Sequence, residues 1–246
     1  MGDREPVNKT QVHGAFPVTR WTLVQHAVGE GSGSKAALES LCRNYWYPLY
    51  SYARRSGVPA ADAEDLTQGF FALLLEKGWL ADADQAKGKL RTFLLTAFRR
   101  FQTNEWRKAS TQRRGQGKVI PMAELEGIEE RYADAHPGLS AEELFDRHWA
   151  LALLRNVLEN LESEFAAAGK AREYDSLKGV LMADRGELNY SKLAEALGTS
   201  EGAARVAAHR LRKKFRRRFR EAISATLDED ADLTEEMVFM AKVLAD

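Results

Sequence analysis

The segment from residue 205 to residue 220 is the part of this chain whose residue types most clearly indicate chemistry. It contains nine Arg or Lys residues and no acidic residue. Guanidinium and ammonium groups bind phosphate oxygens, so this concentration of cations predicts a surface that binds nucleic acid. The side chains that we expect to contact DNA here are Arg205, His209, Arg210, Arg212 and Lys213.

A second segment, residues 91–108, alternates cations with aromatic residues. Cations follow a phosphate backbone while Phe and Trp faces stack on unpaired bases, a combination typical of single-stranded DNA binding. Phe93, Phe98 and Trp106 cannot all point into a core, so at least one is expected to be accessible. The candidate DNA-binding residues of this segment are Arg91, Phe93, Arg99, Arg100, Asn104, Arg107 and Lys108.

Residues 62–68 combine acidic and amide side chains. Asp62 and Glu64 suit the first turn of a helix, where acids complement the helix dipole. Asp65 and Gln68 are three residues apart and lie opposite an apolar stripe. Their spacing suits a polar docking surface for a partner, with plain stabilisation of the helix as the alternative.

We expect the cationic segment to form a helix. Residues 189–205 predict a short helix, a turn at Gly198 and a second helix capped by Thr199 or Ser200. The second helix has one buried stripe, at spacings of three and four, that consists of Ala204, Ala208, Leu211, Phe215 and Phe219. A helix-turn-helix with a cationic second helix is suited to entering the DNA major groove.

Strand patterns are nearly absent, so we expect an all-α fold. Residues 109–139 contain scattered Gly and Pro without periodicity and predict a linker, and Ser140 begins a capping-box pattern. Cys42 falls on an apolar helical stripe, as a buried thiol would. The expected order is an N-terminal extension (1–34), a first small helical domain (35–112), a flexible linker (113–139), a helix-turn-helix domain (140–227) and an acidic tail (228–246).

The net charge of zero conceals strong segregation of charge along the chain. Residues 87–118 carry ten cations and one acid, whereas residues 121–146 and residues 221–246 each carry eight acids and one cation. Acidic segments beside basic ones either shield the DNA-binding surface in the free protein or simply keep it soluble. The tail also has the periodicity of an amphipathic helix.

Several functional classes are disfavoured. No apolar run is long enough for a membrane span, the N-terminus lacks the apolar core of a signal peptide, and a single cysteine forms no disulfide within the chain. We therefore expect a cytoplasmic protein. The five histidines are scattered, with no metal-ligand spacing, nucleophile elbow or phosphate loop, so we expect no catalytic residue, metal or cofactor, and no enzyme.

Taken together, these residues resemble a bacterial RNA polymerase sigma factor of the extracytoplasmic-function (ECF) group in the sigma-70 family. Residues 62–68 resemble the region-two helix that docks on the clamp helices of the largest polymerase subunit. Residues 91–108 resemble the following segment, which grips the −10 promoter element and holds a flipped base. Residues 200–205 and 209–212 resemble the region-four helix that reads the −35 element. The resemblance covers about residues 35–112 and 143–224.

The resemblance implies that core polymerase and promoter DNA are partners. Polymerase would be bound by Asp62, Glu64, Asp65 and Gln68, and the DNA contacts would include Ser200 and Glu201 besides the cations above. The chain departs from the family at Arg100 and Asn104, where Asn and Asp are usual, and is apolar at Ala203, Val206 and Ala207. Regulation would come from an anti-sigma protein or other regulator, or from the acidic tail covering the basic helix.

Two other functions remain open from the sequence. One is a stand-alone helix-turn-helix regulator, a dimer formed through residues 234–245, which would bind duplex DNA without polymerase. The other is a sigma-like protein that titrates a regulator without starting transcription, an alternative suggested by the altered residues Arg100 and Asn104.

Overall fold

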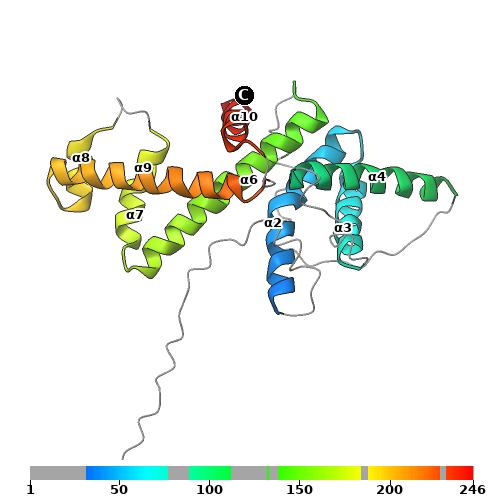
Figure 1. Ribbon diagram of the computed structural model, residues 1–246, viewed down its shortest axis with the longest axis horizontal. Coiled ribbons are helices and arrows are strands. Elements are labelled where there is room, and N and C mark those ends of the chain that lie inside the picture. Colours follow the sequence, from blue (N-terminus) through cyan, green and yellow to red (C-terminus); the bar gives the residue numbers. More distant parts are fainter. Residues whose placement is uncertain are drawn as a thin grey trace, which may run out of the picture.

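The apolar stripes of the sequence form the buried faces of helices in a computed structural model of the protein (Figure 1). The structure describes residues 32–76, 89–111, 132, 138–183, 188–227 and 231–245. Within these ranges the protein is helical and contains no strand, which confirms the predicted all-α class.

The first group of helices consists of α2 (Ser32–Arg55), α3 (Ala60–Glu76) and α4 (Leu90–Thr111). Aromatic side chains fill the space between them, and the rings of Phe70 and Phe98 meet edge to face with centroids 5.2 Å apart. Gly57 adopts a positive φ of 90° between α2 and α3, a conformation that glycine tolerates. Cys42 is buried on α2, as its place on the apolar stripe predicts.

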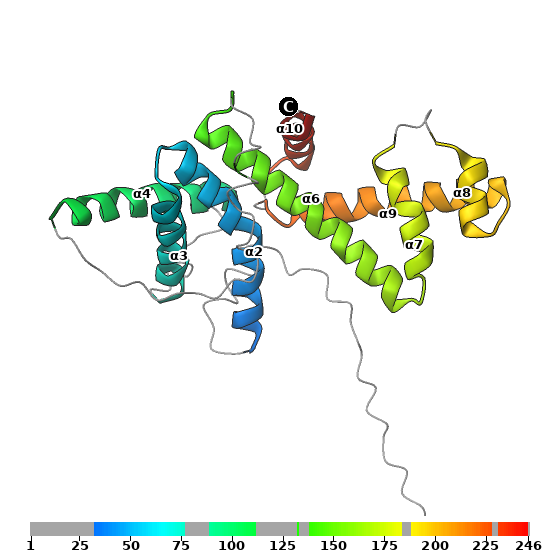
Figure 2. The same ribbon diagram turned by 180° about the vertical axis from the view of Figure 1, so that it is seen from behind.

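The long helix α6 (Ala141–Ala167) begins at the capping box that the sequence predicts. The Ser140 side chain accepts a hydrogen bond from the Glu143 amide, and the Glu143 carboxylate accepts one from the Ser140 amide. The first half of α6 packs along α2, where the Trp149 indole donates to the Tyr45 hydroxyl at 3.2 Å. Its second half contacts the helices that follow, so α6 joins the two halves of the protein in both views (Figures 1 and 2).

The second group comprises α7 (Ala171–Leu177), the 3-10 turn η2 (Lys178–Leu181), α8 (Tyr190–Leu197) and α9 (Glu201–Ser224). Tyr174, Leu177 and Val180 are buried in this group, and Ala208 and Leu211 of α9 are buried in the same core. Figures 1 and 2 place α9 and α4 toward opposite ends of the molecule, with α6 between them.

Residues 233–245 of the acidic tail form helix α10 (Leu233–Ala245), which lies against α6 and α9. Its amphipathic pattern is confirmed, because Met240 is fully buried and Leu233 and Met237 pack against the core. Arg147 of α6 donates a hydrogen bond of 2.8 Å to the Val243 carbonyl near the end of α10. The helix of the tail is therefore packed against the helical core.

The buried side chains of both groups belong to one continuous cluster that extends from α2 to α10. The division into domains at 35–112 and 140–227 stays a prediction, and most of the predicted linker lies outside the described residues. The same holds for most of the predicted extension, although α2 begins at Ser32, within it. No helix in the described ranges is long and apolar enough to cross a membrane.

Candidate nucleic-acid interface

The helix-turn-helix forms where the sequence predicts it. The Asn189 side chain caps α8, Gly198 adopts a left-handed φ of 61° in the turn, and Ser200 caps α9 by accepting from the Ala203 amide at 3.2 Å. Only a residue that tolerates positive φ reverses the chain here without strain. The Ser200 hydroxyl, predicted to contact DNA, already has this capping role.

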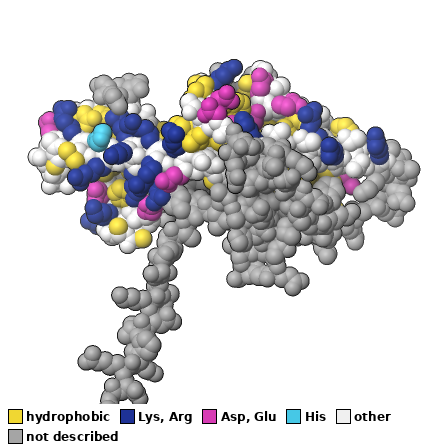
Figure 3. Space-filling model, viewed as in Figure 1, with side chains coloured by type: hydrophobic (Ala, Val, Ile, Leu, Met, Phe, Trp, Pro, Cys, Tyr) yellow, Lys and Arg dark blue, Asp and Glu magenta, His cyan; other side chains and the backbone are white. Residues whose placement is uncertain are grey.

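One long face of α9 is exposed and cationic. Arg205, His209 and Lys213 recur at intervals of four, and all three are exposed. Dark blue Lys and Arg side chains cover the end of the molecule that α8 and α9 form (Figure 3). The guanidinium of Arg205 lies 4.4 Å from the centroid of the Tyr190 ring. The same guanidinium lies 3.9 Å from the Glu201 carboxylate. These contacts hold the predicted DNA-binding residues Arg205 and Glu201 at the outer start of α9.

Arg212 has a different position from the other predicted DNA-binding cations. Its Nε donates to the Val180 carbonyl at 3.2 Å and its Nη2 donates to the Ala183 carbonyl at 2.9 Å. Val180 belongs to η2 and Ala183 follows it, so Arg212 ties α9 to the chain that precedes the helix-turn-helix. The neighbouring Lys213 and Arg210 are exposed. In this arrangement the guanidinium of Arg212 supports the fold, which the basic pattern alone did not indicate.

The later part of α9 carries cations that are neutralised within the chain. Glu164 of α6 pairs with Lys214 at 2.6 Å and with Arg218 at 2.7 Å, and Glu221 pairs with Arg218 and Arg217. Lys214 and Arg218 are therefore the least open of these later cations, whereas Arg216, Arg217 and Arg220 stay exposed.

An open groove of about 580 Å³ lies between the end of α6, α7 and the start of α9. The three apolar residues that depart from the family pattern, Ala203, Val206 and Ala207, line it together with Phe165 and Leu177. Val206 is 48% exposed. The apolar positions of α9 thus face this groove, beside the cationic face.

The exposed face of α4 carries Arg99, Arg100, Asn104 and Arg107. Trp106 lies beside them and is 56% exposed, which confirms that one aromatic residue of this segment is accessible. Phe93 is half-buried and packs against the core. Lys108 lies in α4, but its side chain is outside the described residues. The resemblance to sigma factors also implies that a loop at Trp79–Lys89 lies near the flipped base, and residues 79–88 are likewise outside the described residues.

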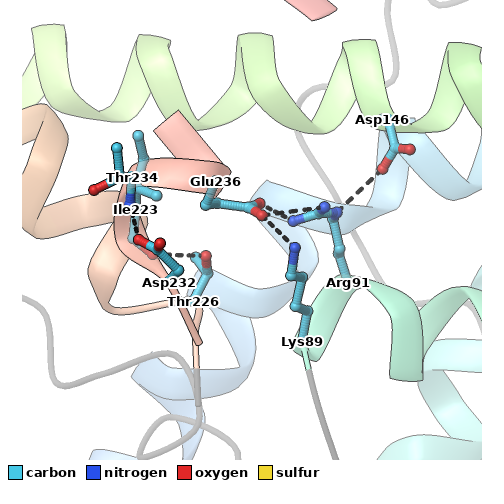
Figure 4. A network of polar contacts seen from close by, with 8 residues as sticks. All are labelled: Lys89, Arg91, Asp146, Ile223, Thr226, Asp232, Thr234 and Glu236. Carbon is cyan, nitrogen blue, oxygen red and sulfur yellow. Dashed lines mark hydrogen bonds and ion pairs between the residues drawn. The ribbon is translucent and has the colours of Figure 1, made fainter. Parts of the chain in front are cut away.

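Arg91, in contrast, does not reach the exposed face of α4. It is 6% exposed, and its guanidinium lies 4.7 Å from the centroid of Trp149 and 4.5 Å from that of Phe239. It bonds to Glu236 of α10, and its Nε lies 3.2 Å from Asp146 of α6 (Figure 4). The predicted contact of Arg91 with DNA is unavailable in this arrangement, because two acids and two rings enclose the cation.

Sequence reasoning missed the acids of this network. Glu236 belongs to the predicted acidic tail, and its burial was not predicted: it is fully buried and accepts from both Arg91 and Lys89. The sequence does contain a sign of this burial, since Glu236 lies on the apolar stripe of α10, three residues after Leu233 and four before Met240. Burial raises the pKa of Asp146 even though the Arg91 guanidinium acts to lower it.

The predicted docking residues lie on α3. Asp62 and Asp65 are exposed, Glu64 is half-buried, and the Gln68 amide donates to the Glu64 carboxylate at 3.3 Å. The four side chains occupy two successive turns of one helix. Asp62 stands in the first turn, where its charge also complements the helix dipole.

No protein-family model, characterised protein or solved structure that we compared with this chain matches it. Among the described residues, no group of three or more His, Cys, Asp or Glu side chains is placed to hold a metal ion.

Proposed function

We propose that this chain is a bacterial RNA polymerase sigma factor, which binds core polymerase and directs promoter recognition and melting. The observation that carries the proposal is the pairing of two nucleic-acid-type helices in one molecule. Helix α9 follows a capped turn and presents Arg205, His209 and Lys213, whereas α4 presents Arg99, Arg100 and an exposed Trp106.

The two helices suit different forms of DNA. A capped helix with an exposed cationic first half is suited to a duplex major groove, where phosphate contacts orient it and side chains reach base edges. A cationic helix with an exposed indole is suited to an unpaired strand, because the ring stacks on a base while the cations bind the backbone. A protein that opens a promoter needs both.

The acidic face of α3 supports a role for a protein partner. Asp62 and Asp65 are exposed and would repel DNA, so they are suited to a basic or amide-rich surface such as the clamp helices of polymerase. Polymerase supplies the catalysis, and this chain supplies the choice of promoter. We expect it to act in the cytoplasm, with no cofactor of its own.

The test is reconstitution. The purified chain is mixed with sigma-free bacterial core polymerase, and transcripts from a genomic DNA library are sequenced. The variant D65A/Q68A should lose core binding and specific starts. The matched control E159A/N160A changes an acid and an amide that are exposed on α6, and it should retain both activities.

Two results would overturn the proposal. Tight duplex binding without binding to core polymerase would identify a stand-alone regulator. Core binding that produces no specific transcript under any template condition would identify a protein that titrates a regulator.

A further inference from the structure

Acidic residues from the C-terminal half of the chain form ion pairs with cations at the start of α4 and on its outer face. Glu236 of α10 pairs with Lys89 at 2.6 Å and with Arg91, and Asp146 of α6 also pairs with Arg91. Figure 4 shows both acids converging on the start of α4 from separate helices. On the exposed face of α4, Glu142 of α6 pairs with Arg99 at 3.2 Å. Each pair engages a cation at the start or on the outer face of the helix that we propose to bind the −10 strand.

These contacts differ from ordinary surface ion pairs in their burial. The Glu236 side chain is 0% exposed and that of Arg91 is 7% exposed. A buried charge needs a partner of opposite sign, and loss of either residue would leave the other with one partner, Lys89 for Glu236 or Asp146 for Arg91. The Lys89 side chain is 35% exposed and the Arg99 side chain 55%, so these two pairs open more easily.

We propose that α6 and α10 hold α4 in an autoinhibited arrangement, in which Glu236, Asp146 and Glu142 occupy cations that would otherwise bind the DNA backbone. The inference rests on the proposed function. Carboxylate and phosphate oxygens accept hydrogen bonds from the same guanidinium donors, so the two ligands exclude each other at Arg91. DNA would gain this residue only after α10 moves away from the start of α4.

The experiment compares the affinity of the full chain for single-stranded DNA before and after removal of these acids. The probe is a fluorescein-labelled oligothymidine strand of about 16 nucleotides, followed by anisotropy over a salt series. The test variants are E236Q and E142Q. The matched controls, E235Q and E159Q, remove the same charge from exposed positions on the same two helices.

We expect E236Q to bind the strand about fivefold more tightly than E235Q at 0.1 M salt for each cation that is released. The logarithmic salt slope should also steepen by about 0.7 per released cation. E142Q should show a smaller gain, because Arg99 is already exposed. Equal or weaker binding by both test variants relative to their controls would overturn the inference, since a contact that only stabilises the fold predicts no gain.

Because the buried substitution at Glu236 can unfold the chain, the wild-type protein provides a second test. Hydrogen exchange across residues 233–245 is measured with and without saturating oligothymidine. Faster exchange in α10 on DNA binding is expected, and unchanged or slower exchange would contradict the proposed release.

The two proposals fail in distinguishable ways. A chain that starts specific transcripts, but whose E236Q variant binds DNA no more tightly than E235Q, loses only the autoinhibitory contact. A chain whose E236Q variant binds the strand more tightly, but which ignores core polymerase, keeps the contact and loses the sigma role.

Discussion

The carboxylate of Glu236 binds the guanidinium of Arg91 across 145 positions of the chain, and both side chains are buried. This pair makes the helix of the acidic tail a structural part of the protein. It also places the C-terminal helix at the start of α4, where the sequence predicts a contact with DNA. The stability of the core and the availability of Arg91 therefore depend on the same contact.

Replacement of Arg91 by Met should strongly destabilise the protein, because it leaves Glu236 buried with only Lys89 as a cationic partner. We expect a loss of about 3 kcal/mol in the free energy of unfolding. The double variant R91M/E236M should recover much of this loss, because it removes both buried charges. Urea unfolding of wild type, R91M, E236M and the double variant measures the coupling energy between the two side chains. Additive losses would contradict the buried pair.

Adjacent cations on α9 should have separate effects. R212A removes two hydrogen bonds, to the carbonyls of Val180 and Ala183, and should lower the free energy of unfolding by about 1–3 kcal/mol. K213A removes an exposed cation, so it should leave stability unchanged and weaken duplex binding, with a shallower salt dependence. Thermal unfolding and anisotropy titrations separate the two roles. A stability loss confined to K213A would refute the assignment.

Trp106 should contribute to DNA binding and not to folding. Its indole is 56% exposed at the outer end of α4, so W106A should change the free energy of unfolding little. The same variant should weaken binding to a single strand by about 1–3 kcal/mol, the usual value of one stacked base. W106F retains a ring and serves as the control, with most of the affinity preserved. An unchanged affinity for W106A would remove the stacking role.

The capping box at the start of α6 should be measurable on its own. S140A removes the side-chain acceptor for the Glu143 amide and should cost about 1 kcal/mol of stability. Hydrogen bonds from Ser140 lower the pKa of Glu143. The cap therefore contributes its full stability at pH values above the usual carboxyl pKa, and this contribution is lost as the pH falls through the lowered pKa. The difference between wild type and S140A should therefore shrink in acid. A constant difference across pH would argue against the reciprocal cap.

Asp146 should give the opposite pH dependence. Burial raises its pKa, so the folded protein binds this proton more readily than the unfolded chain. Its contribution to stability therefore declines as the pH rises from about 4 through the folded pKa. D146N removes this decline. As the pH rises over this range, the urea midpoint of wild type should therefore decrease relative to that of D146N. Parallel midpoint curves for the two proteins would exclude a raised pKa.

Local patterns predicted the helices well because short-range physics determines them. Ser140 and Ser200 cap helices through amides three residues away, and Gly198 turns the chain through its own backbone freedom. Periodicity likewise predicted the burial of Cys42, Ala204 and Leu211. The same pattern indicated that most cations of α9 would be exposed, whereas Arg212, Lys214 and Arg218 are half-buried.

Only the tertiary structure decided which charged residues pair. Arg91 and Arg100 look equivalent in the sequence, yet one is enclosed by Trp149 and Phe239 while the other is exposed. An ion pair between Arg91 and Glu236 depends on how α4, α6 and α10 pack, and no local periodicity encodes that packing. The sequence by itself therefore determined the helices and their cationic faces. The fold decided which of those cations are open to a ligand, because burial and long-range pairing depend on helices distant in the chain.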